Sequence, residues 1–206
     1  MYLDDCIVFA KGNTEFLSRL RKVFTKFAMH KIFLKAKKCK FGMKKIEYVG
    51  KEISKYGITM SEHKINHVLN FPRPGNHTQL RSFLGLANYF RDFVPNHSHI
   101  VHPLHSMIDT SATKRTVITW TPEGEIASDR IRDLISKCPL LHFVNDTAPI
   151  TLMTDASDYG IGGYLFQRVD NRDQPIAFIS KSLTEIQLRW STIQRRRTQY
   201  FIAALN

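Results

Sequence analysis

The sequence has few of the features that mark secreted or membrane proteins. Only three cysteines occur in 206 residues, Cys6, Cys39 and Cys138, and their wide spacing fits neither a disulfide framework nor a zinc knuckle. No apolar run approaches the roughly 20 residues that a membrane span requires. Acids stand at positions 4 and 5, where a targeting peptide would carry bases. These absences predict an intracellular protein with reduced thiols and no membrane partner.

Acidic residues are also scarce relative to basic ones. Thirty lysines and arginines against 18 acids give a formal net charge of +12, which attracts polyanions such as nucleic acid. The alternative is a solvated basic surface without such a partner. Aromatic residues interleave with the bases at Phe33, Phe41 and Tyr48, as expected beside a phosphate backbone, although each one alone is better explained as a core residue than as a stacking platform. The bases concentrate in the first part of the chain, at Arg19, Arg21, Lys22, Lys26, Lys31, Lys35, Lys37, Lys38, Lys40, Lys44, Lys45, Lys51 and Lys55.

The hydrophobic pattern predicts a mixed chain of helices and strands. In its first half, short strands at 1–3 and 6–10 flank two aspartates and would place them at a hairpin tip. Further elements follow the apolar periodicity and its breaks at proline and glycine. They are helices from about Asn13, at 62–70 and at 78–93, and strands at 34–41 and 46–53, the second with a bend at Gly50.

The second half begins with a helix and continues with strands. Thr121 is a good N-cap and Pro122 suits the first helical position, so a helix should start there. Thr184 and Gln187 form a capping box that opens a final helix, which would still be running at Asn206, so the chain looks cut at both ends. Strands are predicted at 150–154, 161–168 and 176–180, joined by turns at 158–160 and 171–173.

The paired aspartates are the first candidates for chemistry. Adjacent carboxylates repel each other, so Asp4 and Asp5 are most simply explained by a divalent cation that neutralises them. Two-metal phosphoryl transfer uses such carboxylates to hold ions about 4 Å apart. An ordinary Asp-Asp turn is the alternative, and the spacing alone favours it.

Several motifs, in order along the chain, together resemble the reverse transcriptase of Gypsy-type long-terminal-repeat retrotransposons. They are Tyr2-Leu3-Asp4-Asp5, Lys37-Lys38-Cys39-Lys40-Phe41, Tyr48-Val49-Gly50, Phe71-Pro72-Arg73-Pro74 and the string Leu-Arg-Ser-Phe-Leu-Gly-Leu-Ala-Asn-Tyr-Phe-Arg at 80–91. The string Thr-Asp-Ala-Ser-Asp-Tyr-Gly-Ile-Gly at 154–162 resembles the opening strand and hairpin of the same polyprotein's ribonuclease H. The resemblance covers nearly the whole chain.

The resemblance implies an α+β layout in four parts. Residues 1–60 would be the C-terminal part of the reverse-transcriptase palm, 61–110 a helical thumb, 111–145 a connection, and 146–206 the first half of a ribonuclease H-like α/β domain. In the parent polyprotein, protease and integrase segments would accompany these parts. A cytoplasmic particle or the nucleus would be the place of action.

The resemblance also assigns residues to sites. Asp4 and Asp5 match the metal-binding pair of the polymerase, and Asp155 the first metal ligand of the ribonuclease H, with Mg²⁺ or Mn²⁺ as the cofactor. An RNA/DNA hybrid or another nucleic acid would be the partner. Asp158 is better explained as a turn residue. The residues expected to contact nucleic acid are Tyr2, Lys37, Lys38, Lys40, Phe41, Tyr48, Gly50 and Arg81.

The sequence departs from the family pattern in ways that predict an inactive isolated chain. The family's third polymerase aspartate and its nucleotide-holding fingers precede the aspartate pair, so this chain alone cannot complete that metal site. Gln194 and Arg196 stand where the family has glutamates in the ribonuclease H helix. Arginine cannot bind a divalent cation and would pair with Asp155 instead; a solvated helix face is the alternative for 195–197. Two hypotheses remain open: a piece of a working polymerase and ribonuclease H, or a catalytically silent remnant that binds nucleic acid without sequence preference.

Overall fold

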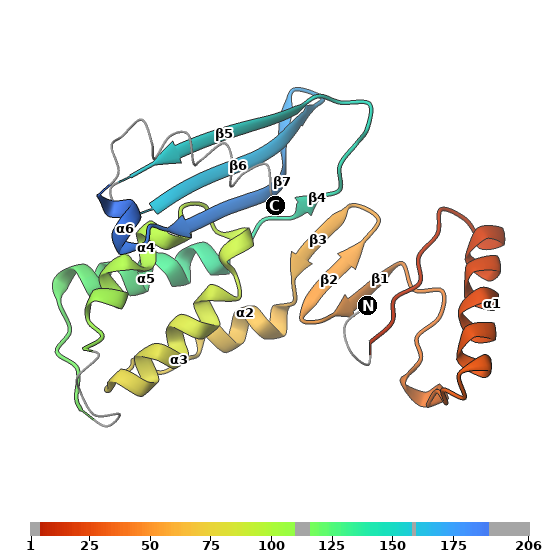
Figure 1. Ribbon diagram of the computed structural model, residues 1–206, viewed down its shortest axis with the longest axis horizontal. Coiled ribbons are helices and arrows are strands. Elements are labelled where there is room, and N and C mark those ends of the chain that lie inside the picture. The colour runs from red at the N-terminus through yellow and green to blue at the C-terminus, as the bar shows by residue number, and fades with distance from the viewer. Residues whose placement is uncertain (1–4, 110–115, 158–159, 190–206) are drawn as a thin grey trace. The chain divides into compact units, whose positions relative to one another are not determined.

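The structure is a computed structural model that describes residues 5–109, 116–157 and 160–189 (Figure 1). Helices and strands are mixed, as the predicted α+β class requires. The chain forms two compact units, Met1–Lys55 and Tyr56–Asn206, and each is described here by itself. In the described ranges no helix combines the length and the apolar character needed to cross a membrane.

The first unit contains one long helix and one hairpin. Helix α1 (Asn13–Met29) begins at the predicted residue, but none of its side chains is buried within the described part of the unit. Strands β1 (Lys45–Tyr48) and β2 (Lys51–Ser54) pair antiparallel through a tight turn in which Val49 and Gly50 have φ of 49° and 70°. Two consecutive positive φ values match the hairpin turn that follows the natural twist of the strands.

Three strand predictions in this unit are wrong. The single strand predicted at 46–53 is a hairpin, because Gly50 tolerates the left-handed conformation and the chain reverses there. The segment 34–41 carries the 3-10 turn η1 (Ala36–Lys38) in place of a strand. Residues 6–10 are extended coil without strand pairing. Apolar residues, alternating with polar ones in the two later segments and continuous at 6–10, suggested strands, but a strand also needs a partner for its backbone groups.

The helices of the second unit largely follow the predicted positions. Helix α2 (Glu62–Leu69) and helix α5 (Pro122–Ser136) match the predictions, and the Thr121 side chain accepts a hydrogen bond from the Gly124 amide as an N-cap. Helix α3 (His77–Asn88) ends five residues before the predicted 93, and the 3-10 turn η2 (Arg91–Phe93) follows it. Helix α4 (His97–Ser106) was not predicted, because four histidines and an internal Pro103 lower its helical propensity.

One apolar core joins these helices. The predicted apolar face of α3 is buried, with Leu80, Phe83 and Ala87 fully inaccessible to solvent. Phe90 and Phe93 extend the same surface. Ile131 and Ile135 of α5 and Val101 and Leu104 of α4 pack into the same cluster. Removal of this much apolar surface from water is what stabilises the helical part.

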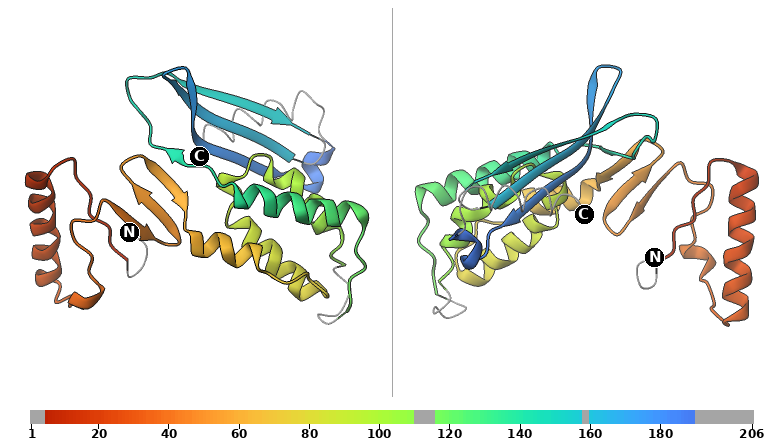
Figure 2. Two further views of the ribbon diagram at one scale, coloured as in Figure 1. Left: turned by 180° about the vertical axis from the view of Figure 1, so that it is seen from behind. Right: turned by 45° about the horizontal axis from the view of Figure 1, so that its top comes forward.

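The strands of the second unit form two pairings. Strand β3 (Gly57–Met60) pairs antiparallel with the short β4 (Leu141–His142), and neither was predicted. Strands β5 (Ile150–Ala156), β6 (Gly160–Val169) and β7 (Arg172–Ser182) form an antiparallel sheet in that order. All three strands were predicted, but β7 begins four residues before the predicted 176. Helix α6 (Glu185–Leu188) opens with the predicted capping box. Figures 1 and 2 show the layers of this unit: the sheet, then α4 and α5, then α2 and α3.

Candidate nucleic-acid and metal sites

The segment before α1 carries one of the two predicted polymerase aspartates. Asp5 is exposed and makes a single β-bridge, and its backbone carbonyl accepts a hydrogen bond from the Tyr48 hydroxyl at 3.4 Å. The contact joins the aspartate segment to the β1–β2 hairpin. Asp4 and Tyr2 lie outside the described residues, so the geometry of the predicted pair stays a prediction. Residues 6–10 form no strand, and residues 1–4 lie outside the described part of the chain, so the hairpin tip predicted for the two acids stays a prediction.

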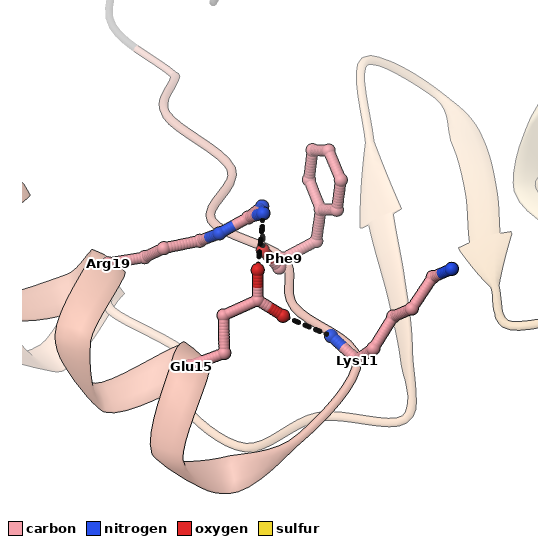
Figure 3. A network of polar contacts seen from close by, with 4 residues as sticks. All are labelled: Phe9, Lys11, Glu15 and Arg19. Atoms are coloured by element: carbon pink, nitrogen blue, oxygen red, sulfur yellow. Dashed lines mark hydrogen bonds and ion pairs between the residues drawn. The ribbon is translucent and has the colours of Figure 1, made fainter.

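A small polar network fixes the same segment to α1 (Figure 3). The Glu15 carboxylate accepts a hydrogen bond from the Lys11 amide at 3.1 Å and pairs with the Arg19 guanidinium at 2.6 Å. Arg19 also donates to the Phe9 carbonyl at 2.8 Å and lies 5.5 Å from the Phe9 ring centre. The Lys11 amide and the charge of Arg19 lower the pKa of Glu15. The network therefore orients the chain between Asp5 and the first turn of α1.

The first unit has a strongly basic surface. Fourteen lysines and arginines against five acids in residues 1–55 give nine of the twelve net positive charges. Lys37, Lys38 and Lys40 are all exposed, in η1 and just after it. Phe41 is 53% exposed and meets Phe24 edge-on with ring centres 6.2 Å apart. The structure thus gathers predicted phosphate contacts and one exposed aromatic in the same unit.

The remaining predicted contacts have distinct settings. Tyr48 is half-buried at the end of β1, and Gly50 is the second residue of the hairpin turn. Arg81 is exposed on α3, which belongs to the second unit. The structure therefore brings all the described contacts except Arg81 into one unit.

Asp155 lies on β5, beside a hollow of about 170 Å³ in the second unit. It is exposed and stands directly opposite Gly162 of β6, which in turn stands opposite Ser180 of β7. Facing residues in paired strands project from the same side of a sheet, so Asp155 and Ser180 share one face. The hollow is lined by Asn96, Ser98, His99, Asp155, Ser157, Gly160, Ile161, Gly162 and Ser180.

The first turn of α4 closes this hollow from above the sheet. The Ser98 amide donates to the Ser180 hydroxyl at 2.8 Å, and the Ser180 hydroxyl donates to Ser98 Oγ at 2.9 Å. A Cβ added at Gly160 would lie 3.5 Å from Ser98 Cβ, and one at Gly162 only 2.4 Å from Asn96 Oδ1. The contact of Gly160 with Ser98 is an ordinary van der Waals distance, so it is the missing side chain of Gly162 that leaves room for α4 on the sheet.

The α4 contribution to this hollow was missed in the sequence. Asn96 is a natural N-cap residue, and Ile100, Val101 and Leu104 follow it at helical spacing, so a helix start was visible there. Within the described ranges, no three His, Cys, Asp or Glu side chains come together as a metal site. Besides His99, the hollow is lined by one carboxylate, an asparagine amide and serine hydroxyls. Carboxylate and amide oxygens are ligands of the kind that Mg²⁺ binds.

Comparison with known proteins places the chain in a family. Residues 120–201 match the RNase H-like domain found in reverse transcriptase. The chain is 30% identical over 191 residues to the Transposon Tf2-3 polyprotein of Schizosaccharomyces pombe, covering 92% of this chain and 14% of that polyprotein. It is 34% identical over 196 residues to the Retrovirus-related Pol polyprotein from transposon 297 of Drosophila melanogaster, covering 95% and 18%. The chain belongs to the Gypsy-type retrotransposon pol family.

The fold of this pol segment also has a solved counterpart. A foamy viral protease-reverse transcriptase in complex with an RNA/DNA hybrid superposes with a TM-score of 0.76 at 24% identity, covering 96% of this chain and 26% of that one. Another structure of that protein, in complex with double-stranded DNA, has the same TM-score and identity and is covered over 41% of its chain. The pol segment spans about one seventh of the Tf2 polyprotein and under a fifth of the transposon 297 polyprotein.

Proposed function

We propose that this pol segment belongs to an RNA-directed DNA polymerase with ribonuclease H and binds the nucleic-acid duplex on which that enzyme acts. The observation that carries the proposal is the basic surface of the first unit, with nine of the twelve net charges in its 55 residues. The foamy viral relatives were solved with an RNA/DNA hybrid and with double-stranded DNA, which supports the same partners here.

In this proposal the first unit holds the duplex through its phosphates. Lys37, Lys38 and Lys40 are exposed cations on one short segment, which suits contact with successive phosphates. Phe41 offers an exposed ring beside them, and Tyr48 and Gly50 lie on the hairpin proposed to touch the primer end. Arg81 on α3 would contact the duplex from the helical part. A hybrid has A-form features that are recognised through phosphates, sugars and groove shape, so no sequence preference is expected.

Divalent metal is proposed at two places. Asp5, with Asp4, would hold Mg²⁺ or Mn²⁺ at the polymerase site, and the exposure of Asp5 suits that role. Asp155 would be the first ligand of the ribonuclease H-like site, whose oxygen-rich hollow fits a hard cation. When bound, such ions would neutralise the phosphate and the oxygens attacking and leaving it. The chain's own part is to supply these carboxylates and, in the first unit, the basic surface that contacts the phosphates.

The isolated 206-residue chain is proposed to be inactive in both reactions. It carries two of the three aspartates that the family's polymerase site uses, and the family's ribonuclease H glutamates are replaced by Gln194 and Arg196. We expect neither templated nucleotide incorporation nor hybrid cleavage by the purified chain. Incorporation above background, or magnesium-dependent cleavage that disappears in Asp155→Asn, would contradict this.

A salt titration of hybrid binding tests the nucleic-acid proposal. The logarithm of the association constant should fall linearly with the logarithm of the salt concentration, because binding releases counterions. The triple variant Lys37→Gln, Lys38→Gln and Lys40→Gln should lower that slope by about 2 to 3, roughly one for each phosphate contact removed. The matched control neutralises three exposed bases of the second unit, Arg130, Lys137 and Arg172. Equal loss of slope in both triple variants would refute a binding surface centred on η1.

A further inference from the structure

Asp155 is paired across the sheet with a glycine, Gly162, and the side chain of Asn96 occupies the space beside it. Asp155 and Gly162 face each other across β5 and β6. A Cβ at Gly162 would lie 2.4 Å from Asn96 Oδ1, so the Asn96 amide occupies the space where that side chain would begin. Side chains of facing residues start about 5 Å apart. The amide of Asn96 therefore stands beside Asp155 as a cross-strand neighbour would, although it comes from the start of α4.

The backbone of Asn96 is suited to this placement. Its φ of 51° and ψ of 32° put it in the left-handed region, which asparagine tolerates better than most residues. Its side chain makes no capping hydrogen bond to α4, although it is the N-cap residue. The side chain is thus directed to the sheet and not to its own helix.

Three amides of the first turn of α4, those of residues 98–100, already donate to protein acceptors, which bears on what kind of ligand fits. A helix start usually presents amides that attract anions. Here the Ser98 amide donates to Ser180, and the His99 and Ile100 amides donate to the Asn96 carbonyl at 3.0 and 3.2 Å. The polar side chains that line the hollow belong to Asp155, Asn96, His99 and the serines at 98, 157 and 180. Apart from the His99 imidazole they offer oxygen donors, and the Asp155 carboxylate adds a negative charge, a combination that favours a hard divalent cation.

The hollow is also large enough for such an ion with part of its water shell. Its volume of about 170 Å³ compares with roughly 30 Å³ for one water molecule in the liquid. Mg²⁺ in proteins usually keeps several waters and takes only one or two carboxylates. A site with one carboxylate and one amide oxygen meets that requirement.

We propose that Asn96 supplies a second oxygen ligand to the divalent cation at Asp155, so that helix α4 completes the ribonuclease H-like site. The inference rests on the proposed metal role of Asp155. It assigns a metal-binding residue in the helical part of the chain, 59 positions before Asp155 in the sequence. The site would then form only when α4 is seated on Gly160 and Gly162.

The test measures Mn²⁺ binding to the full chain by electron paramagnetic resonance. Asn96→Asp places a second carboxylate at the same position and should tighten Mn²⁺ binding about tenfold or more, since affinity at such sites follows ligand charge. Asn96→Gly, which keeps the left-handed backbone without strain, should weaken binding about tenfold, the usual cost of losing a group that supports a metal site. Asn70→Asp, at an exposed position just after α2, is the matched control and should leave the affinity unchanged.

The outcomes separate this inference from the proposed function. If Asp155→Asn lowers Mn²⁺ binding while both Asn96 variants bind like the wild type, the metal role of Asp155 stands and the role of Asn96 is refuted. If Asp155→Asn binds Mn²⁺ as the wild type does, the metal proposal itself fails. Tighter binding by Asn96→Asp cannot result from misfolding, so that gain is the decisive result.

Discussion

The buried histidine at the start of α4 makes the second unit sensitive to acid. His97 is 4% exposed, and its Nε2–H donates to the Ala87 carbonyl at 3.1 Å near the end of α3. Its pKa falls from 6.5 to about 4, mainly because the ring is buried and to a lesser extent because Arg91 and His105 are nearby, while the bond to Ala87 and the charge of Asp92 act in the opposite direction. The folded unit therefore holds the neutral ring, whereas the unfolded chain protonates it near pH 6.5.

The loss of stability in acid can be calculated from the difference between the folded and unfolded pKa of His97. Because the pKa is lower in the folded state, stability is fully present above pH 6.5 and falls as the pH drops toward 4, below which the loss stops growing. A shift of that size, at about 1.4 kcal/mol for each pKa unit, corresponds to about 3 kcal/mol of unfolding free energy. A loss of this order is a large part of the stability of an ordinary domain.

Urea unfolding followed by tryptophan fluorescence measures this loss, since both tryptophans belong to the second unit in sequence. Between pH 7.5 and pH 4 the wild type should lose about 3 kcal/mol more than His97→Gln, whose amide can still donate to Ala87 but does not titrate. His63→Gln, at an exposed position on α2, is the control and should keep the wild-type pH dependence. If His97→Gln and the wild type lose the same free energy over this range, the argument from the buried ring is wrong.

Substitutions at four positions test the packing of the second unit. Arg132→Met should lower the free energy of unfolding in urea by about 2 to 4 kcal/mol. The Arg132 guanidinium donates to the carbonyls of Val68, Leu69 and Phe71 and lies over the Phe83 ring. An Arg132→Lys variant as stable as the wild type would contradict the role given to the planar guanidinium. Gln167→Leu should lower the free energy of unfolding by about 2 to 3 kcal/mol in the same assay, because Gln167 is 98% buried and its amide hydrogen-bonds the backbone of Asn145 and Ala148. An unchanged urea midpoint would contradict this. Gly85→Ala on α3 should raise the free energy of unfolding by about 0.5 to 1 kcal/mol, because alanine favours a helix and nothing lies within 4 Å of the added methyl group. Gly57→Ala should instead lower the melting temperature, because the added Cβ would clash with the Leu141 carbonyl.

Local sequence signals predicted the elements that carry their own start and stop information. The capping residues Thr121 and Thr184, and the apolar spacing of α3, act over a few residues and were sufficient to place α5, α6 and α3. Local signals failed at 34–41 and 46–53. Apolar and polar residues alternate there, but whether a strand forms depends on a backbone partner elsewhere in the chain. The turn at Val49-Gly50 and the left-handed backbone there convert one predicted strand into two.

The sequence by itself determined the family, the basic excess of the first 55 residues and the carboxylates proposed to bind metal, because these depend on residue identity and order alone. The tertiary structure alone decided what surrounds Asp155. In the sequence Gly162 is only one residue of the strand predicted at 161–168, but in the fold it leaves the space that admits Asn96, which lies more than 60 residues earlier in the chain. Such a contact depends on how α4 packs on the sheet, and no local pattern of residues predicts the packing of two segments so far apart in the sequence.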